Sequence, residues 1–348
     1  MRALMLLPVD SQPRLIKRVN QFILKYDVVV AYQVRDYFKK NKIPENCLKI
    51  KLNKIENGSY HKRIFKLFTS FAKIRKLKYK YDVICSFSFD LLIISMFIKC
   101  DYRIYEIGDI RRIKWKVFDL LYRFLLNRQN KIIVTSNMFA EYLIKKYKIP
   151  SSKIKIIENK LNPELFSTKP IPKLKFNDRK IKVGIIGLLR YRQIIDFLSV
   201  IVHNENLEVY IYGSGPLSSD ILKFVNDKNI FYHGEFEYPK DLEEIYSKID
   251  LSFVMYDSNE LNVRLALPNK LYESIYFNVP LIVSSNTYLS KKVEEYGVGF
   301  SYNIQNISEL PLKINEIVKN GMFVKYSENC KKIERTKIFI NETDHPIL

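Results

Sequence analysis

The chain of 348 residues is long enough for two domains, and its 47% hydrophobic and 14% aromatic content excludes a disordered protein. Four dispersed cysteines and four histidines favour a reducing compartment, give no zinc-binding spacing and exclude a disulfide-rich secreted fold. The net charge is +21, and residues 1–150 hold nearly all of it, with 32 Lys and Arg against 12 Asp and Glu, so this half is expected to face an anionic partner.

Short apolar runs rich in β-branched residues alternate with helix-length segments in the first half of the chain. The opening run, Ala3 to Leu7, is too short for a signal peptide and predicts a strand. The longest uncharged apolar run, 91–98, is far shorter than the ~20 residues of a membrane-spanning helix. Strands are predicted at 3–7, 27–31, 47–52, 82–87, 102–107, 131–136 and 154–159, and helices at 61–80, 88–99, 111–127 and 138–147.

Residues 61–80 carry eight Lys and Arg and no acid, with apolar residues at helical spacing beside them. Such a helix can pack on a sheet with its basic face in solvent, lie on an anionic bilayer, or do both. Nucleic acid is the other anionic partner that the charge allows, but the sequence has no RNA-binding motif. An anionic membrane surface is therefore the expected partner of the N-terminal half, and nucleic acid is not expected.

The second half repeats the alternation of strands and helices. Strands are predicted at 182–187, 208–213, 229–234, 250–256 and 279–284, and helices at 191–203, 217–227, 239–248, 268–277 and 289–296. Alternating strands and helices indicate a parallel sheet covered on both faces, and two such series indicate two doubly wound domains. A proline-containing stretch before 182 separates the series, which gives an N-terminal domain at 1–165, a C-terminal domain at 166–320 and a basic helical end at 321–348.

Doubly wound sheets bind ligands beyond the carboxyl ends of their strands, and two glycine-containing turns follow strands of the second half. Gly187 precedes Arg190 and Arg192, so helix amides and cations there are able to meet a phosphate. Gly213 and Gly215 form a Gly-x-Gly turn that lacks the third glycine of a dinucleotide fingerprint. Taken alone, each turn is more often an ordinary strand-to-helix connection.

The stretch LALPNKLYESIYFNVPLI raises a different question, because it places a lysine at the start of a helix. Pro268 suits a first turn, and Lys270 and Glu273 share one helix face. The lysine opposes the helix dipole, which is understandable if its charge joins the free amides in holding an anion. Glu273 is able to accept two hydrogen bonds from a ribose diol. The alternative is a surface Lys–Glu pair.

In the first half, Glu106 and Asp109 follow a predicted strand, with Arg111 and Arg112 behind them. Two carboxylates at this position are suited to acid–base work or to binding sugar hydroxyls. The alternative reading is that Asp109 caps a helix.

The blocks IIVTSNMFAEYL, IIENKLNPELF, VGIIGLLRYR, VYIYGSGP and LPNKLYESIYFNVPLIVS occur in an order that resembles family 4 glycosyltransferases of the GT-B fold, in a Pro-Asn-Lys-x-x-Glu subtype. The resemblance is clearest over residues 130–300. It implies two Rossmann-like domains that face each other across a cleft, with the C-terminal helix at 321–348 packing back on the N-terminal domain. It also implies a UDP- or GDP-linked sugar bound by the C-terminal domain.

By position, the resemblance assigns Glu273 to the ribose, and Arg190 and Lys270 to the diphosphate. Asp109, Arg190 and Lys270 become the expected catalytic residues. The remaining expected donor-binding residues are Gly187, Gly213, Gly215, Asn262, Arg264 and Asn269.

Two departures from the family pattern weaken the carry-over. Leu265 stands where the family often has a glutamate that contacts the donor sugar, and Gly108 stands where it often has a histidine. Lys160 also replaces a usual glycine. The sugar contact must then come from other residues, and the role of Asp109 is left less defined.

The resemblance implies sugar transfer to a saccharide or polyprenyl-diphosphate-linked acceptor, with retention, in capsule, lipopolysaccharide or glycolipid synthesis at the inner face of the cytoplasmic membrane. No Asp-x-Asp pattern is present, so we expect no metal and no other cofactor. The alternatives are a non-catalytic GT-B-like or nucleic-acid-binding protein and, less favoured, a nucleotide-sugar epimerase of similar fold.

Overall fold

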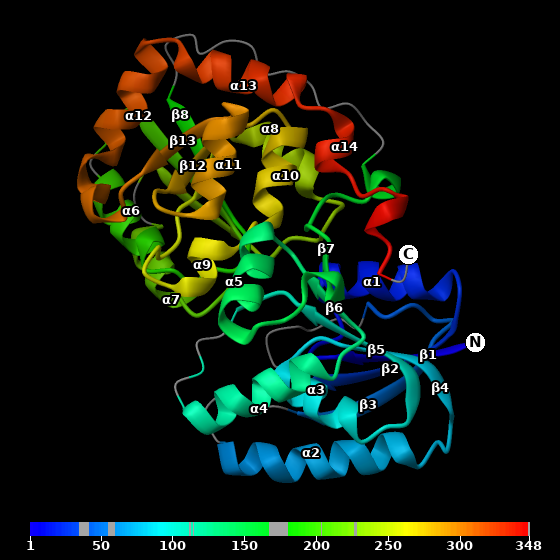
Figure 1. Ribbon diagram of the computed structural model, residues 1–348. Coiled ribbons are helices and arrows are strands. Elements are labelled where there is room, and N and C mark those ends of the chain that lie inside the picture. The colour runs from blue at the N-terminus through cyan, green and yellow to red at the C-terminus, as the bar shows by residue number, and fades with distance from the viewer. Residues whose placement is uncertain are drawn as a thin grey trace. The chain divides into compact units, whose positions relative to one another are not determined.

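The computed structural model describes residues 1–34, 42–54, 60–110, 113, 115–166, 180–202, 204–225 and 228–346, with only the backbone of 60–66 and 342 (Figure 1). The chain divides into two compact units. Unit 1 comprises 1–158 and 342–348, and unit 2 comprises 159–341. Arg111, Arg112 and most of the expected boundary before 180 lie outside the described residues.

Unit 1 is built on a parallel sheet of seven strands in the order β3-β2-β1-β4-β5-β6-β7. Its strands are β1 (Arg2–Leu7), β2 (Asp27–Val34), β3 (Leu48–Lys54), β4 (Tyr81–Ser86), β5 (Cys100–Ile107), β6 (Lys131–Val134) and β7 (Ile154–Ile156). Its helices are α1 (Pro13–Ile23), α2 (Tyr60–Arg75), α3 (Phe89–Met96), α4 (Lys116–Asn127) and α5 (Asn137–Tyr147).

Alternation along β1 explains why helices cover both faces of this sheet. Met5 and Leu7 pack in one core cluster with Leu15 and Phe22 of α1. Leu4 and Leu6 point to the opposite face, where the apolar residues of α2 and α3 pack. Successive side chains of a strand point to opposite faces, so a strand buried on both faces is apolar throughout.

Unit 2 has a parallel sheet of six strands in the order β10-β9-β8-β11-β12-β13. Its strands are β8 (Ile181–Ile186), β9 (Leu207–Tyr212), β10 (Ile230–Gly234), β11 (Leu251–Val254), β12 (Leu281–Ser284) and β13 (Gly299–Tyr302). Its helices are α6 (Gln193–Ile201), α7 (Ser218–Ile221), α8 (Leu242–Lys248), α9 (Leu261–Leu265), α10 (Asn269–Tyr276), α11 (Tyr288–Tyr296), α12 (Leu310–Lys319), α13 (Met322–Lys332) and α14 (Arg335–Ile338).

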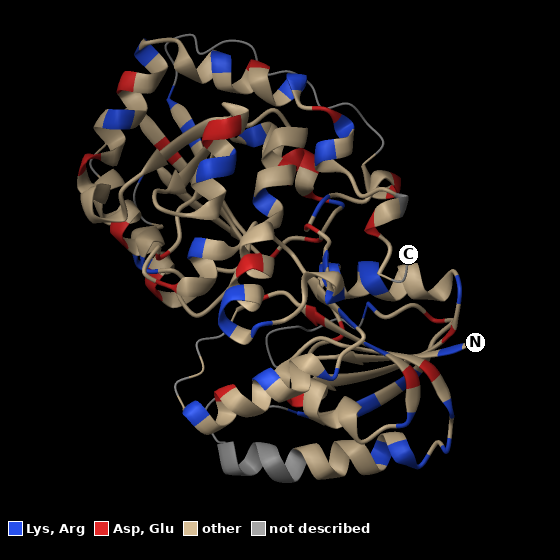
Figure 2. Ribbon diagram, in the orientation of Figure 1, with Lys and Arg blue, Asp and Glu red and all other residues tan. Residues whose placement is uncertain are grey.

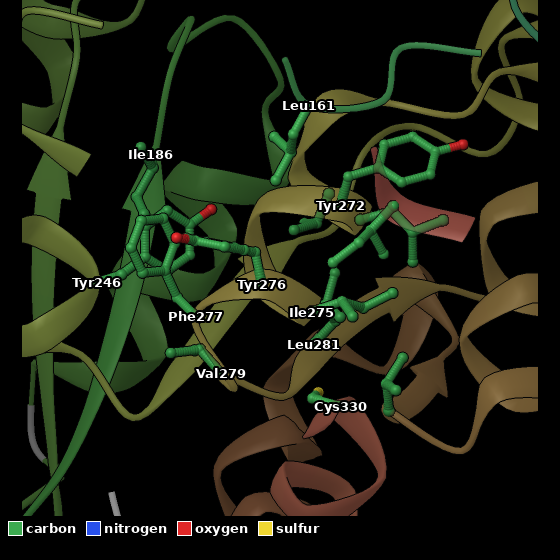
Figure 3. Packing of buried hydrophobic residues seen from close by; sticks show 14 of the residues in the cluster. Leu161, Ile186, Tyr246, Tyr272, Ile275, Tyr276, Phe277, Val279, Leu281 and Cys330 are labelled. Carbon is green, nitrogen blue, oxygen red and sulfur yellow. The ribbon is translucent and has the colours of Figure 1, made fainter. Parts of the chain in front are cut away.

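Helix α10 packs against one face of this sheet. Six of its eight residues are buried, including Tyr272, Ile275 and Tyr276, and Phe277 directly after it stacks on Tyr246 of α8 with ring centroids 4.6 Å apart. Figure 3 shows these side chains gathered around the helix together with Leu281 of β12 and Cys330 of α13. A helix packed on several sides holds its polar residues in fixed positions, which matters for the site below.

Both domains are doubly wound, as the alternation predicted, but the sequence interpretation missed several elements. It missed α1, α9, α12 and strand β13, and in the described part of the expected helix at 217–227 there is one short helix, α7, followed by a 3-10 turn at Leu222–Phe224. β13 has only four residues, GFSY, two of which are partly exposed, so its apolar signal is weak.

The C-terminal end also differs from the expectation for 321–348. Helix α13 contacts α10 and α12, and α14 contacts α10, so these helices belong to unit 2. Only the last residues join unit 1, where Lys155 Nζ donates to the His345 carbonyl at 2.7 Å. The buried apolar residues Phe323, Cys330 and Ile338 explain this, because they pack in the two cores of unit 2.

Helix α2 packs on the sheet, which was the first of the possibilities given for residues 61–80. Ile74 is buried, and Leu67, Phe71 and Leu77 pack against the same core, so the apolar stripe faces the sheet. Lys73 and the basic residues after it are exposed. Lys62 and Lys66 lie among the residues whose side chains are not described.

Candidate functional site

The strand order of unit 2 reverses between β8 and β11, which pair side by side at the middle of the sheet. The carboxyl ends of these two strands are therefore the expected ligand-binding point. Gly187 follows β8, and Tyr256 follows shortly after β11. The sequence-predicted residues Gly187, Lys270 and Glu273 prove to meet there.

The two glycine turns are packed backbone against backbone. Gly187 has φ +118° and Gly213 has φ +132°, conformations that side chains rarely adopt. A Cβ on Gly213 would lie 1.8 Å from the Gly187 carbonyl oxygen, and one on Gly215 would lie 2.5 Å from that of Leu189. Hydrogen bonds from Gly187 N to the Tyr212 carbonyl and from Leu189 N to the Ser214 carbonyl join the two turns, at 2.8 and 3.1 Å. Gly213 and Gly215 thus position the Gly187 turn.

Gly187 itself is left open on its side-chain face. The nearest atom to a Cβ built there is Lys270 Cε, at 3.7 Å, which is ordinary van der Waals contact. The stem of Lys270 therefore crosses the turn after β8. A ligand that approaches the Gly187 backbone meets the lysine at the same place.

Lys270 and Glu273 form a buried ion pair. Pro268 caps α10, so Lys270 lies in the first turn and Glu273 one turn further on. Lys270 Nζ lies 2.5 Å from Glu273 Oε2, and the two side chains are 12% and 2% exposed. The alternative reading of a surface Lys–Glu pair is thus wrong in its burial, although the two residues do pair. Tyr246, on the neighbouring helix α8, donates a further hydrogen bond to Glu273 Oε2 at 3.1 Å.

Three tyrosines lie near the Glu273 carboxylate: Tyr246 is buried, and Tyr238 and Tyr256 are partly buried. The pKa of the Tyr246 phenol is raised well above its ordinary value, mainly by burial and secondly by the negative charge of Glu273. Burial is also the largest cause that raises the pKa values of Tyr238 and Tyr256. These phenols therefore stay protonated at neutral pH, and Tyr246 remains a hydrogen-bond donor to the carboxylate.

Arg190 is supported by two stacked aromatic rings. Its guanidinium lies over the Tyr191 ring, with Cζ 4.7 Å from the ring centroid, and its Nη2 donates to the Tyr191 hydroxyl at 2.6 Å. Tyr191 in turn stacks on Tyr256, with centroids 4.5 Å apart. Cation–π contact of this kind orients an otherwise flexible side chain. Arg190 itself is exposed, so its charge is accessible to a ligand.

The remaining predicted donor residues lie around α9 and α10. Asn262 is half-buried and Arg264 is exposed on α9, and Leu265 ends that helix. Asn269 is the first residue of α10 and is half-buried. Lys160, at the start of unit 2, donates from Nζ to the Thr336 carbonyl at 3.1 Å and so ties its loop to α14.

Glu106 and Asp109, the two acidic residues of unit 1 that were predicted to act together, have different environments. Glu106 is wholly buried in β5 and forms an ion pair with Arg18 of α1 at 2.6 Å, so it is a structural residue of the core. Asp109 is exposed after β5, and α4 begins only at Lys116 with Trp115 as its cap, so Asp109 does not cap that helix. The pairing of two accessible carboxylates is therefore wrong.

Arg14 takes up the space that a side chain at position 108 would need. A Cβ on Gly108 would lie 1.6 Å from Arg14 Nη1 and 2.1 Å from Cζ. The Arg14 guanidinium, which extends from α1, therefore lies against Gly108 in the turn after β5. Sequence reasoning missed Arg14 because α1 itself was not predicted.

Sequence reasoning also missed the tyrosines that contact the predicted residues. Tyr191, Tyr246 and Tyr256 lie in segments where an aromatic residue is equally typical of a core position. The one signal that could have pointed to Tyr191 is its place directly after Arg190, because an arginine is able to stack on a neighbouring tyrosine ring.

Across the described part of the chain, no three His, Cys, Asp or Glu side chains gather into a set that is able to hold a metal ion. None of the helices described there has the length and apolar character needed to cross a membrane.

Residues 167–337, nearly all of unit 2, match the family described as glycosyl transferases group 1. No curated protein matches the chain. Among solved structures, sucrose-phosphate synthase from Thermosynechococcus elongatus is similar with a TM-score of 0.74 at 13% identity, covering 99% of this chain and 96% of that one.

Two further solved structures are similar over the same extent. Anabaena Alr3699/HepE in complex with UDP-glucose has a TM-score of 0.72 at 13% identity, over 99% of this chain and 97% of that one. WaaG, a glycosyltransferase involved in lipopolysaccharide biosynthesis, has a TM-score of 0.69 at 12% identity, with the same coverage. At these identities the likeness establishes the fold, and the predicted GT-B architecture is confirmed.

Proposed function

Because residues 167–337 belong to the group 1 glycosyl transferases and the chain is a glycosyltransferase of the GT-B fold, we propose that it moves a sugar from a nucleotide-sugar donor to a saccharide or polyprenyl-diphosphate-linked acceptor. The observation that carries the proposal is the buried Lys270–Glu273 pair beside Gly187, at the switch point of the unit 2 sheet. The crystal structure of HepE with UDP-glucose supports a UDP-linked donor, and GDP is the alternative.

In this proposal each polar group of the site has one task. The Glu273 carboxylate accepts hydrogen bonds from the two ribose hydroxyls, while the hydrogen bond from the Tyr246 phenol holds the carboxylate in place. Lys270 leaves its contact with Glu273 and, with Arg190, neutralises the diphosphate that lies over the Gly187 turn. Asn262, Arg264 and Asn269 line the donor, and the Leu265 position gives it no carboxylate.

Sugar transfer then depends on stabilising the departing diphosphate. Two cations aimed at the leaving group supply electrostatic stabilisation that grows as charge develops, at roughly 3 kcal/mol for one well-placed donor. We propose that this replaces a metal ion, and that the product retains the anomeric configuration. Asp109, exposed in unit 1, is the proposed residue on the acceptor side.

The acceptor side is proposed to work at a membrane. Residues 1–150 carry a net charge of +20, which suits a diphosphate-linked lipid acceptor and an anionic cytoplasmic membrane face. The likeness to WaaG supports a role in lipopolysaccharide, capsule or glycolipid synthesis.

Thermal-shift measurements with UDP, GDP and CMP and their sugars test the donor proposal. One nucleotide is expected to stabilise the wild type and the Glu316→Ala control, whose carboxylate lies in an exposed pair on α12, but not Glu273→Ala. An equal shift in all three proteins would contradict the assigned role of Glu273. RNA binding without any nucleotide shift would favour a nucleic-acid-binding protein. Loss of turnover in EDTA, restored by Mn²⁺, would contradict metal independence.

A further inference from the structure

Helix α4 of unit 1 exposes an unusual number of large apolar side chains. Trp115, Val117 and Leu120 are 72%, 75% and 65% exposed, and Phe118, Leu121 and Phe124 are exposed as well. Only Leu125 and Leu126, near its end, are buried apolar residues of this helix. Single exposed apolar residues are normal on a protein surface, but six within ten positions form a patch that calls for a partner.

Specific contacts hold α4 with this patch outward. Asp119 accepts hydrogen bonds from Lys146 Nζ at 2.8 Å and from the Tyr147 hydroxyl at 2.7 Å, both on α5. Tyr122 packs edge-on against Phe89, Tyr105 and Tyr147. Asp119 and Tyr122 thus lie on the side of α4 that faces the rest of unit 1, and the exposed apolar residues lie on the other side.

The patch continues across neighbouring elements on the same side of the sheet. Helix α3 contacts both α2 and α4. Phe68 on α2 and Phe97 at the end of α3 are largely exposed, and the exposed basic residues Lys73 and Arg75 end α2. Figure 2 shows basic residues at that end of α2, while most of α4 is uncharged.

The charge around this surface indicates which kind of partner binds it. Lys116, Arg123 and Arg128 are exposed on and directly after α4, and residues 1–150 carry a net +20. A second copy would bring two strongly positive halves together, which is repulsive. An anionic bilayer offers both acyl chains for the apolar residues and negative headgroups for the basic ones.

We propose that α4 inserts the side chains of Trp115, Phe118, Leu121 and Phe124 into the interface of an anionic bilayer, while the basic end of α2 contacts the headgroups. The proposal rests on the membrane location in the proposed function and adds to it the element that enters the lipid. It places the main apolar contact on α4 and not on residues 61–80, where Leu67, Phe71, Ile74 and Leu77 pack on the sheet.

Trp115 is the only tryptophan of the chain, so intrinsic fluorescence reports the insertion without a label. The full chain is mixed with vesicles of phosphatidylcholine alone or with phosphatidylglycerol, some brominated on the acyl chains. Anionic vesicles are expected to shift the Trp115 emission to shorter wavelength, and the brominated lipids to quench it. The Phe118→Ser/Leu121→Ser double variant is expected to lose at least about tenfold in partition coefficient.

The control is Leu312→Ser, which removes a leucine of α12 in unit 2 that is even more exposed than Phe118 and Leu121, and it is expected to bind like wild type. Circular dichroism checks that the variants are folded. Binding to anionic vesicles with unchanged emission would overturn the α4 proposal and leave charge-driven membrane binding intact. A blue shift that grows with protein concentration in the absence of lipid would also overturn it, because it indicates a second copy as the partner. The UDP thermal shift is read separately, so failure of the donor proposal is distinguishable from failure of insertion.

Discussion

Lys270 Nζ lies 2.5 Å from Glu273 Oε2 in an ion pair that is almost completely excluded from solvent. Removing two charges from water costs free energy that their attraction does not reliably return, so the pair is poor evidence of a stabilising role. Its position beside Gly187 gives it another role, because a ligand that takes over either partner frees the other to bind as well.

A double-mutant cycle separates the structural role of this pair from its proposed binding role. Lys270→Met and Glu273→Gln are each expected to lower the free energy of unfolding by roughly 2–4 kcal/mol, since each leaves a buried polar partner unpaired. The double variant is expected to recover roughly 1–3 kcal/mol of the lost free energy of unfolding. It is nevertheless expected to bind no nucleotide. Urea denaturation and nucleotide titration measure the two quantities.

The matched control is Lys313→Met/Glu316→Gln, an exposed pair with the same spacing on α12. Its coupling energy is expected to stay below about 0.5 kcal/mol. If the Lys270→Met/Glu273→Gln protein bound nucleotide like wild type, the pair would be structural only.

Gly213→Ala is expected to damage unit 2 itself. Its Cβ would lie 1.8 Å from the Gly187 carbonyl oxygen at φ +132°, and a backbone atom cannot move away cheaply. We expect a loss of roughly 3 kcal/mol or more in the free energy of unfolding. Gly234→Ala is the control: it has φ +75° and open space around it, so it is expected to cost only about 1–2 kcal/mol. Equal losses in urea denaturation would show that the close approach of the two turns is not tight.

Arg190→Ala is expected to weaken donor binding without weakening the fold. The side chain is exposed, so its removal should change the free energy of unfolding by less than about 0.5 kcal/mol. Losing a charge-assisted contact to a diphosphate should raise the donor KM or Kd by about tenfold or more. Arg192→Ala removes a neighbouring exposed arginine that pairs with Asp196 and is expected to leave donor binding unchanged. Similar effects of both substitutions on donor KM would indicate a general charge effect and no specific site.

The sequence was sufficient to predict the doubly wound fold and the meeting point of Gly187, Lys270 and Glu273. Both rest on local signals, namely apolar runs of strand length and glycine or charge at strand ends. Glu106 could not be assigned in this way, because its partner Arg18 lies 88 residues away on a helix whose core-facing position is occupied by an arginine. A buried arginine reads as a surface residue until its partner is known.

The orientation of α4 was equally beyond the sequence. KVFDLLYRFLLN is apolar on most of its circumference, so periodicity does not tell which side faces the core. Asp119 decides it, through two hydrogen bonds to α5 that no sequence pattern announces.

Lys17 on α1 gives unit 1 a predictable pH dependence. Its pKa is lowered from 10.5 to about 8, mainly by burial and secondly by the positive charge of Arg18. Arg14 acts in the same direction, and the negative charges of Glu106 and Asp344 act against it. Between pH 8 and 10.5 the unfolded chain holds a proton on Lys17 that the folded chain has released, so unfolding takes up a proton. Stability contributed by this group therefore rises with pH across that window, and below pH 8 the full cost of the buried charge is present.

Lys17→Met removes that cost while keeping the length of the side chain. At pH 7 it is expected to raise the free energy of unfolding by on the order of 2 kcal/mol, and the gain should shrink as the pH rises toward 10.5. Lys25→Met, an exposed lysine just beyond α1, is expected to change stability at pH 7 by less than about 0.5 kcal/mol. Urea denaturation of the three proteins at several pH values checks this, because other titrating groups cancel in the differences. A Lys17→Met protein that is less stable than wild type at pH 7 would mean that the contacts of the ammonium group outweigh its burial.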